Sequence, residues 1–320
     1  MAIIHVTERQ TFKACRRQWK YQYQEHLVPI REESGALWIG RGVHYALAAY
    51  YRKEDALAAL DEWLGIKLAE RAEATNNAPL DEKLSEAITL MKGMVERYIE
   101  YAKQNDAWEV VAVEQPFSVK IPTTHGRLEG TLDMVVRRNG RLWVVDHKTF
   151  AQFADPDQLE LDDQMTAYLW LVKQIFQETP AGAIYNQLRK ALPRQPMLLA
   201  SGTRLSKDKS IDTTPEIYLQ AILDHGLDPD DYQDILEKIS VNKFFHRELI
   251  ARNPNELKNF ERNLIDEYRQ MTTKNAPLYP SPSRECLWCD YRNLCKSENE
   301  DGDTQSLKDR LFQEQLERRL

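Results

Sequence analysis

The sequence predicts an α/β protein in which helices come first, a β meander follows, and further helices and a strand complete the chain. Two observations carry this prediction. In the first third, apolar residues recur at three- and four-residue intervals, which is typical of helices. From Trp108 onward the pattern changes to short β-rich segments separated by Pro, Gly and Asn. With 320 residues, the chain is long enough to bury its own core without disulfide bonds.

The first third is expected to be mostly helical. Helices are predicted over 7–25 and from residue 43 to about residue 74, with a turn containing Gly35, Gly40 and Gly42 between them. A break is predicted over 76–79. A third helix is predicted over 81–103, where one apolar stripe has a period of 3.6 residues: Leu84, Ile88, Met91, Val95, Tyr98 and Ile99.

A meander of β-strands is expected after Trp108. The β-rich segments cover residues 110–113, 117–121, 128–136 and 142–145. Beyond the meander the pattern predicts a helix over 159–176, a strand over 183–188, a helical region over 212–273, and an acidic and then amphipathic tail over 297–320.

Composition and charge exclude several classes of protein. The formal net charge of −7 does not attract a polyanion as a whole, so nucleic-acid binding would require a local basic patch. No apolar run approaches the roughly 20 residues of a membrane span, and no Gly-rich phosphate loop suggests an ATP-driven motor. The start MAIIHVTERQ lacks the apolar stretch of a signal peptide and only four cysteines occur, so we expect a cytoplasmic protein, in the host cytoplasm if it is viral.

The strongest local signal is a hairpin whose turn contains Asn139-Gly140. If these two residues form the loop, the numbers of paired residues sum to 279, and Asp133 is expected directly opposite Asp146. Like charges in that position destabilise a sheet, so a positive group is expected between them. Lys148 lies two residues beyond Asp146 and therefore on the same face of the strand.

Two carboxylates and an ammonium group on one face suit phosphodiester hydrolysis. Oxygen ligands of this kind bind Mg²⁺ or Mn²⁺, and a neighbouring lysine can orient water or stabilise charge that develops on a phosphoryl group. The alternative is a solvated ion pair between Asp146 and Lys148, with Asp133 nearby.

Several motifs together resemble one family. The runs Gly130-Thr131-Leu132-Asp133 and Val144-Val145-Asp146-His147-Lys148-Thr149 resemble the core of the PD-(D/E)XK nuclease superfamily, in particular its RecB-type domains. Gln164 and Tyr168 resemble the Gln-x-x-x-Tyr motif, and Gly40-Arg41-Gly42-Val43-His44 resembles the upstream histidine motif. The chain departs from the family name at Leu132, where proline is expected, and at Asp146, where glutamate is common.

The resemblance implies a fold and a set of roles. It implies a restriction-endonuclease-like central mixed sheet flanked by helices. His44, Asp133, Asp146 and the backbone carbonyl of His147 would hold Mg²⁺ or Mn²⁺, while Lys148 would position water and stabilise charge. Gln164 and Tyr168 would orient Lys148 or contact the phosphate, and Glu114 would complete the site. Structural roles remain open for each: a surface or capped His44, a polar contact at the core edge for Gln164 and Tyr168, and a solvent-facing Glu114.

The four cysteines occur at the two ends of the chain. Cys15 lies near the N-terminus, and Cys286, Cys289 and Cys295 form the pattern Cys-x-x-Cys-x₅-Cys. Four thiolates suit either a [4Fe–4S] cluster or zinc, and spacing alone does not decide. The arrangement resembles the iron–sulfur RecB-family nucleases, which include the AddB nuclease domain and the CRISPR-associated exonucleases. This resemblance implies a structural [4Fe–4S] cluster that joins the chain ends, with zinc or free thiols as alternatives.

Two basic windows are candidates for binding nucleic acid. One contains Arg189, Lys190, Arg194, Arg204, Lys207 and Lys209. The other contains Lys13, Arg16, Arg17 and Lys20, interleaved with aromatic residues. Cations would neutralise phosphates, and exposed aromatic rings would stack on bases. We expect Trp19 and Tyr23 to lie in the core instead, so the cations carry the functional interpretation.

Four segments follow from this interpretation: an N-terminal helical region with the first cysteine and the His motif (1–107), a nuclease core (108–190), a helical insertion over the cleft (191–280), and a cysteine-rich segment with the tail (281–320).

The expected function is metal-dependent DNA exonuclease activity on single strands or free ends, in recombination or repair, of cellular or phage origin. One alternative is a subunit that is active only with partner proteins of recombination or CRISPR adaptation. Another is a nucleic-acid-binding module with a degenerate core.

Overall fold

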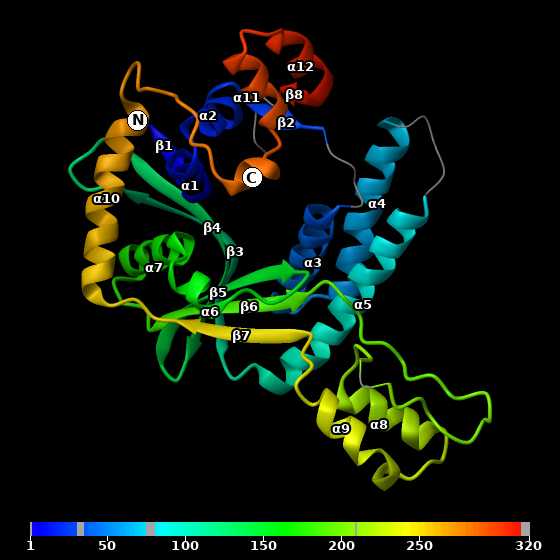
Figure 1. Cartoon of the computed structure of the whole chain (residues 1–320). Coiled ribbons are helices and arrows are strands. Elements are labelled where there is room, and N and C mark those ends of the chain that lie inside the picture. The colour runs from blue at the N-terminus through cyan, green and yellow to red at the C-terminus, as the bar shows by residue number, and fades with distance from the viewer. Residues whose placement is uncertain (1, 31–34, 75–80, 209, 315–320) are drawn as a thin grey trace.

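The computed structural model describes residues 2–30, 35–74, 81–208 and 210–314. At its centre lies one mixed sheet, which in the described chain has six strands (Figure 1). The order is β1-β4-β5-β6-β7, and β3 pairs with β4 as well. The strands are β1 (Ile3–His5), β3 (Glu109–Lys120), β4 (Arg127–Arg138), β5 (Arg141–Phe150), β6 (Gly182–Arg189) and β7 (Phe245–Ile250). The expected α/β fold with a central mixed sheet flanked by helices is confirmed.

The sheet divides at β4. Its first residues, 127–129, pair in parallel with β1, whereas its last residues, 134–138, pair antiparallel with β5. Since β3 pairs with β4 along almost its whole length, β1 and β5 share the other edge of β4. Residues 130–133 therefore lie at the fork where β5 separates from β4.

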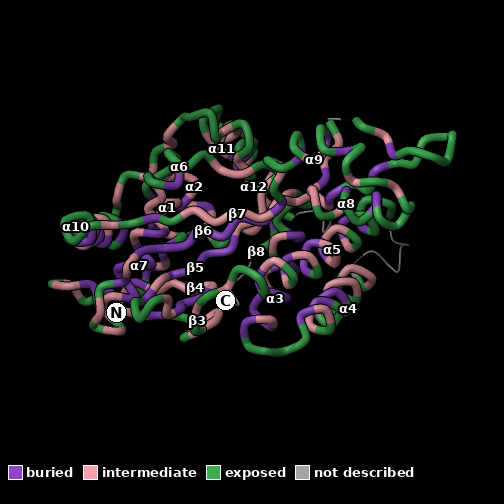
Figure 2. Tube along the Cα trace, turned by 90° about the horizontal axis from the view of Figure 1, so that it is seen from below, coloured by how far each residue is buried: buried purple, intermediate pink, exposed green. Residues whose placement is uncertain are grey.

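Helices cover both faces of the sheet. On one face, α1 (Val6–Ala14), α7 (Asp163–Phe176) and α10 (Pro254–Thr272) pack against alternate strand residues such as Val135 and Val144. On the other, α3 (Ala36–Tyr51), α4 (Ala56–Ala74) and α5 (Glu82–Asn105) pack against Met134 and Val145. Alternation along each strand thus supplies both cores. Figure 2 shows the strands β5 and β6 largely buried between these layers.

The two ends of the chain form a smaller unit together. After α2 (Arg16–Trp19) and a turn of π-helix (Lys20–Gln24), β2 (Leu27–Pro29) pairs antiparallel with β8 (Phe312–Glu314). A 3₁₀ turn (Arg284–Leu287), α11 (Arg292–Asn299) and α12 (Thr304–Leu311) complete the unit, which Figure 1 shows at the top. Its core consists of Tyr21, Leu27, Tyr291, Leu294 and Phe312.

The hairpin and the other strands of the meander agree with the sequence pattern, with two differences in detail. The β4–β5 pairs sum to 279 as predicted, from Arg138–Arg141 to Met134–Val145. The segments 110–113 and 117–121 form parts of one long strand, β3, whose register shifts between Val110 and Ala112. The helix predicted over 7–25 breaks at Cys15, whose backbone is extended, with φ −156° and ψ 113°.

The glycine-containing turn predicted before residue 43 is wrong. Gly40 and Gly42 lie inside α3, and Gly35 caps its start. A Cβ atom on Gly42 would come within 2.6 Å of Met91 Sδ and 2.9 Å of the Trp63 ring, so the absence of a side chain lets α3 pack closely against α4 and α5. These glycines serve helix packing, a role that a local sequence pattern does not distinguish from a turn.

The segment expected as a helical insertion over the cleft, 191–280, contains helices and one strand. The helices α8 (Pro215–Asp224) and α9 (Gln233–Ile239), with a 3₁₀ turn at Pro229–Tyr232, enclose a small core of their own. Figure 1 shows them at the lower right, below α5. β7 then returns to the main sheet, and α10 packs on α7, so the helical prediction over 212–273 is wrong at residues 245–250. The alternating pattern of this edge strand is too short to stand out from the helices around it.

The short helix α6 (Pro156–Glu160) precedes α7. Among the helices described, none combines the length and apolarity that crossing a bilayer requires. The predicted break at 76–79 and the end of the predicted tail, 315–320, lie outside the described residues.

Candidate active site

Asp133 stands at the fork between β4 and β5. The last pair of the hairpin ladder is Met134–Val145, and beyond it the strands separate. Asp133 Oδ2 accepts a hydrogen bond of 2.6 Å from the backbone N–H of His147. The predicted direct pairing of Asp133 with Asp146 is therefore absent from the ladder, because β4 separates here from β5, which stays paired with β6, and pairs with β1 at residues 127–129. The fork relieves the repulsion that such a pairing would create.

Glu114 approaches Asp133 from the neighbouring strand. The pairs on either side are Val113–Met134 and Gln115–Leu132, so Glu114 faces Asp133 across the β3–β4 ladder. Its φ of 47° lies in the left-handed region, which a non-glycine residue adopts at a cost of about 1 to 3 kcal/mol. Backbone strain at this position is typical of functional sites.

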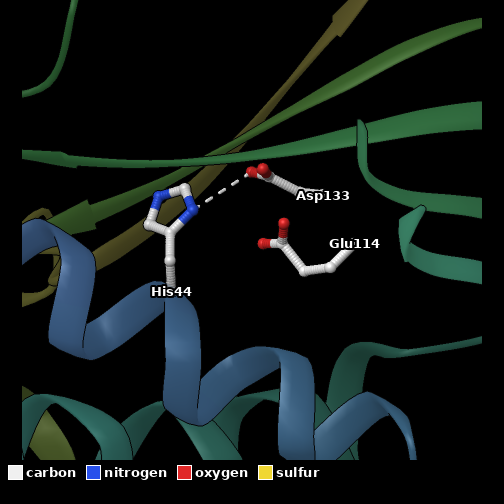
Figure 3. Close-up of side chains that lie close together, drawn as sticks. All are labelled: His44, Glu114 and Asp133. Atoms are coloured by element: carbon white, nitrogen blue, oxygen red, sulfur yellow. Dashed lines mark ion pairs between the residues drawn. The ribbon is translucent and has the colours of Figure 1, made fainter. Parts of the chain in front are cut away.

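His44 completes the group from the helical layer. It lies on α3, and its Nδ1 is 3.5 Å from Asp133 Oδ2. One ligand atom each of His44, Glu114 and Asp133 lies within 4.8 Å of the others. Figure 3 shows the three side chains pointing toward one another from α3, β3 and β4. An imidazole nitrogen and two carboxylates form a donor set that Mn²⁺ or Mg²⁺ accepts, so these residues fit a divalent cation.

Asp146 and Lys148 form a buried ion pair next to this group. Lys148 Nζ lies 2.9 Å from Asp146 Oδ2, and it donates a hydrogen bond of 3.0 Å to Oδ1. The Asp146 side chain is 1 % exposed, whereas the Lys148 side chain is 31 % exposed. Asp146 is not part of the close group formed by His44, Glu114 and Asp133. Its ion-pair partner is Lys148, whose side chain also reaches solvent.

The electrostatics of the site separate the carboxylates. Burial raises the pKa of Glu114 to about 7, and the negative Asp133 adds to this shift. Burial also raises the pKa of Asp146 against the attraction of Lys148. By contrast, His44 and Lys148 outweigh burial and lower the pKa of Asp133.

The neighbouring carboxylates favour the protonated forms of the two basic groups. Burial opposes the charge of Lys148, but the carboxylates of Asp146 and Asp133 raise its pKa well above the ordinary range. For His44, burial lowers the pKa, but the carboxylate of Asp133 outweighs this effect and raises it. At neutral pH the site thus holds a charged ammonium beside carboxylates of differing acidity, which is typical of catalytic centres.

Gln164 and Tyr168 lie on α7, one turn apart. Gln164 Nε2 donates a hydrogen bond of 2.9 Å to the Tyr168 hydroxyl. Burial raises the pKa of Tyr168, and the charge of Asp146 adds to that shift. A Cβ atom on Gly130 would lie 3.3 Å from the Tyr168 ring, so the ring packs beneath the start of the fork.

Comparison with known proteins identifies the family. The family model of the PD-(D/E)XK nuclease superfamily matches residues 5–296. The chain belongs to the PD-(D/E)XK nuclease superfamily. It is therefore a nuclease of the hydrolytic kind, and the resemblance noted from its motifs is confirmed. The match covers the strands from β3 to β7 and all four cysteines.

Other comparisons add little. Among solved structures, a "putative exonuclease" from Eubacterium rectale shares 12 % identity, with 91 % of this chain and 87 % of that chain covered and a TM-score of 0.47. The protein SSO0001 shares 13 % identity, with 92 % and 86 % covered and a TM-score of 0.35. Among curated proteins, no sequence matches.

In this nuclease the four cysteines line a single cavity of about 200 Å³. Three sulfurs accept N–H hydrogen bonds: Cys15 from Ser281 N at 3.5 Å, Cys286 from Ser283 N at 3.4 Å, and Cys295 from Arg17 Nη1 at 3.9 Å. No three of the four sulfurs lie within 4.8 Å of one another. The cavity thus joins the two ends of the chain, but the sulfurs stand wider apart than the ligands of one metal ion.

Several of the cations predicted to bind DNA have partners within the protein. Arg189 donates 2.8 Å to Asp212 Oδ1, and Lys207 Nζ lies 3.2 Å from Asp234 Oδ1. Burial lowers the pKa of Lys190. These contacts stabilise the segment around α8 and α9.

The N-terminal window is also engaged internally. Arg16 donates 2.6 Å to Gln270 and lies over the ring of Tyr279 at 5.3 Å. Arg17 donates to Asn299 as well as to Cys295. Of the remaining predicted contacts, Arg204 is exposed, and Lys209 lies outside the described residues. As expected, Trp19 is buried in the core.

The sequence interpretation did not single out Asn186, Arg247 or Tyr98. These residues form a buried hydrogen-bonded group around the side chain of His147. The available signal was a polar Asn-Gln pair within the apolar strand Gly182–Arg189. A polar side chain at a buried strand position requires hydrogen-bonding partners, but the sequence does not name them.

Proposed function

We propose that this nuclease is a metal-dependent deoxyribonuclease that degrades DNA from single-stranded or free ends. The observation that carries the proposal is the group of His44, Glu114 and Asp133 beside the Asp146–Lys148 ion pair. A divalent cation bound by the group would stabilise the phosphate oxygens that gain charge during hydrolysis. The backbone carbonyl of His147 and the carboxylate of Asp146 are further candidate ligands, as in the family resemblance.

The proposed role of Lys148 follows from its charge and exposure. Because its ammonium stays protonated and its side chain is partly exposed, it can orient the attacking water and donate to the phosphate. Asp146 holds the ammonium in place from the buried side. The hydroxyl of Tyr168, which Gln164 orients, lies where burial and the charge of Asp146 keep it protonated, so it can donate to the same phosphate.

The proposed preference for ends is tested with DNA topology. Linear single strands labelled at each end, and a closed circle of the same sequence, would be incubated with the full chain and Mn²⁺. We expect labelled linear strands to shorten from one end while circles stay intact. Equal cleavage of circles and linear strands would contradict the exonuclease proposal while leaving the nuclease itself in place.

For the cysteine cavity we propose a [4Fe–4S] cluster with a structural role. A single zinc ion with bonds of about 2.3 Å would hold its sulfurs roughly 3.8 Å apart, closer than three of these cysteines lie. A four-iron cluster spaces its thiolates more widely, and hydrogen bonds to the sulfurs are typical of such sites. Binding would bring Cys15 next to three cysteines about 270 residues later and so stabilise the folded chain.

The cluster predicts a metal content and a stability effect. Protein purified without oxygen is expected to contain about four irons and four labile sulfides per chain. Cys289→Ser should lose most of this iron and lower the midpoint of thermal unfolding. Lys148→Ala, which leaves the cavity untouched, should keep the iron and serves as the control. One zinc and no iron per chain would contradict the cluster.

A second candidate function is a subunit that acts only with partner proteins of recombination or CRISPR adaptation. The observation that favours it is the internal pairing of most of the predicted DNA-binding cations, which leaves part of the substrate contact to another chain. Cleavage that requires an added partner would support this alternative.

A further inference from the structure

Behind β5, on the face covered by α3 and α5, lies a buried polar network that the proposed chemistry does not use. Its centre is Asn186 on β6, which is fully buried. Asn186 Nδ2 lies 2.7 Å from His147 Nδ1 and donates 2.8 Å to the Tyr98 hydroxyl. Arg247, on β7, donates 3.0 Å from Nε to Asn186 Oδ1.

The chemistry of Arg247 fixes the orientation of the whole chain of hydrogen bonds. A guanidinium group only donates, so the atom of Asn186 that faces it is the carbonyl oxygen. The amide nitrogen of Asn186 then faces His147 and donates to Nδ1. Because Nδ1 is the acceptor, the ring proton of His147 resides on Nε2. A single arginine thus sets the amide orientation, the tautomer and the rotation of the His147 ring.

A second arm of the network reaches α3. Arg247 Nη2 lies 2.5 Å from Asp106 Oδ1, and Asp106 Oδ2 accepts 2.9 Å from the Tyr51 hydroxyl. The hydroxyls of Tyr51 and Tyr98 are 2.7 Å apart. The ring of Tyr51 stacks on the ring of His147, with centroids 5.5 Å apart and planes 13° apart.

Both arms end on residues that position the metal-binding group. Tyr51 is the last residue of α3, two turns beyond His44 on the same helix. His147 is the residue whose backbone N–H donates to Asp133. The stack of Tyr51 on His147 therefore joins α3, which carries His44, to β5, whose backbone donates a hydrogen bond to Asp133. His44 and Asp133 are the pair whose separation of 3.5 Å defines the site.

We propose that Arg247 is a positioning residue of the nuclease site, which acts through Asn186 and Asp106 to hold His44 and Asp133 at metal-binding distance. The proposal rests on the proposed metal-dependent function. It also gives β7 a role, because the chain returns from the segment around α8 and α9 to deliver this arginine to the network.

The contacts of Arg247 indicate a positioning role and not a catalytic one. Its guanidinium lies over the rings of Trp108, at 4.4 Å, and Tyr101, at 5.0 Å. It donates hydrogen bonds to Asn186, Asn105, Tyr98 and Asp106, all of which lie in the network or at the end of α5. Among its described contacts none is a carboxylate of the candidate metal group, so its effect must pass through Asn186 and Asp106.

The test measures metal binding directly. Mn²⁺ affinity of the full chain is determined without DNA, by electron paramagnetic resonance of free Mn²⁺ and by calorimetry. Arg247→Met keeps the stem that packs on Trp108 but removes every donor, and we expect it to weaken Mn²⁺ binding about tenfold or more, the usual size of effects from groups that orient metal ligands. Arg247→Lys, which keeps the charge but not the forked geometry, should recover part of that loss.

Two further variants keep the result interpretable. Tyr51→Phe retains the stacked ring and loses both hydroxyl contacts, so it should weaken Mn²⁺ binding even if Arg247→Met fails to fold. Arg252→Met is the control: Arg252, just beyond β7, is similarly buried, but it donates to Thr166 on the opposite side of the sheet. We expect wild-type Mn²⁺ affinity for the control.

The possible outcomes distinguish the positioning role of Arg247 from the metal-dependent function on which it rests. Wild-type Mn²⁺ affinity in folded Arg247→Met and Tyr51→Phe proteins would overturn the positioning role while leaving the nuclease proposal intact. Equal weakening in Arg252→Met would also overturn it, because the effect would then reflect general destabilisation. Absence of Mn²⁺ binding by the wild-type chain would instead reject the metal site itself and, with it, this role for Arg247.

Discussion

Replacing Lys148 with alanine is expected to reduce single-strand cleavage by about 10² to 10³ or more, the size of effect seen when one charge-stabilising donor is removed from a catalytic site. Lys148 is the charged donor of the candidate site that pairs with Asp146 and still reaches solvent. The loss should appear in the rate of the chemical step, which single-turnover cleavage at saturating Mn²⁺ measures. DNA affinity should change far less, since one phosphate contact is a small part of strand binding.

The matched control is Lys173→Ala. Lys173 lies on α7, in its last turn, away from the fork between β4 and β5. This variant is expected to cleave at the wild-type rate. Because Lys148→Ala leaves the buried Asp146 without its cation, circular dichroism and thermal unfolding must establish that the variant is folded. Wild-type cleavage by folded Lys148→Ala would remove the lysine from the mechanism.

Mn²⁺ binding is expected to weaken steeply as pH falls. The pKa of Glu114 is raised to about 7 by burial and by Asp133, so the carboxylate is mostly ionised at pH 8 and mostly protonated at pH 5. A proton on Glu114 must leave before the metal binds, which lowers the affinity about a hundredfold between these two values. The raised pKa of Asp146 acts in the same direction. Calorimetric titrations at several pH values measure the slope.

The metal-free protein should show the opposite trend in stability. Since the folded state raises the pKa of Glu114 above its ordinary value of 4.5, the folded state binds more protons than the unfolded state between about pH 4.5 and 7. This group therefore favours folding at low pH, and its contribution declines as pH rises through 7. In Glu114→Gln both trends should flatten. A pH-independent Mn²⁺ affinity would contradict the assignment of Glu114 to the site.

Local sequence signals were enough to predict the hairpin. Asn139-Gly140 set the turn, and the observed pairs down to Met134–Val145 follow from it. The same register rule failed one pair later, at Asp133, because β4 leaves β5 there and pairs with β1 nearer its start. Where a strand changes partners depends on the whole sheet, and no local pattern encodes it.

Longer-range features explain the other differences. Gly40 and Gly42 were predicted to lie in a turn. In the structure they lie in a helix, and a side chain at these positions would approach Met91, Trp63 and Thr149 on other elements too closely. A solvent-facing position was the alternative for Glu114, since nothing in the neighbouring sequence indicates the left-handed backbone with which it faces Asp133. Similarly, the acidic partners of Arg189 and Lys207 lie 23 and 27 residues further along the chain. Counting charges within one short segment therefore does not reveal that these cations are paired.

The central claim is that the site at the fork of β4 and β5 hydrolyses DNA with a divalent metal. The most direct test follows end-labelled single-stranded DNA with the full chain, purified without oxygen, in the presence of Mn²⁺ or of EDTA. We expect progressive shortening with Mn²⁺, none with EDTA, and loss of shortening in Asp133→Asn. Cleavage that persists in EDTA or in Asp133→Asn would contradict the central claim.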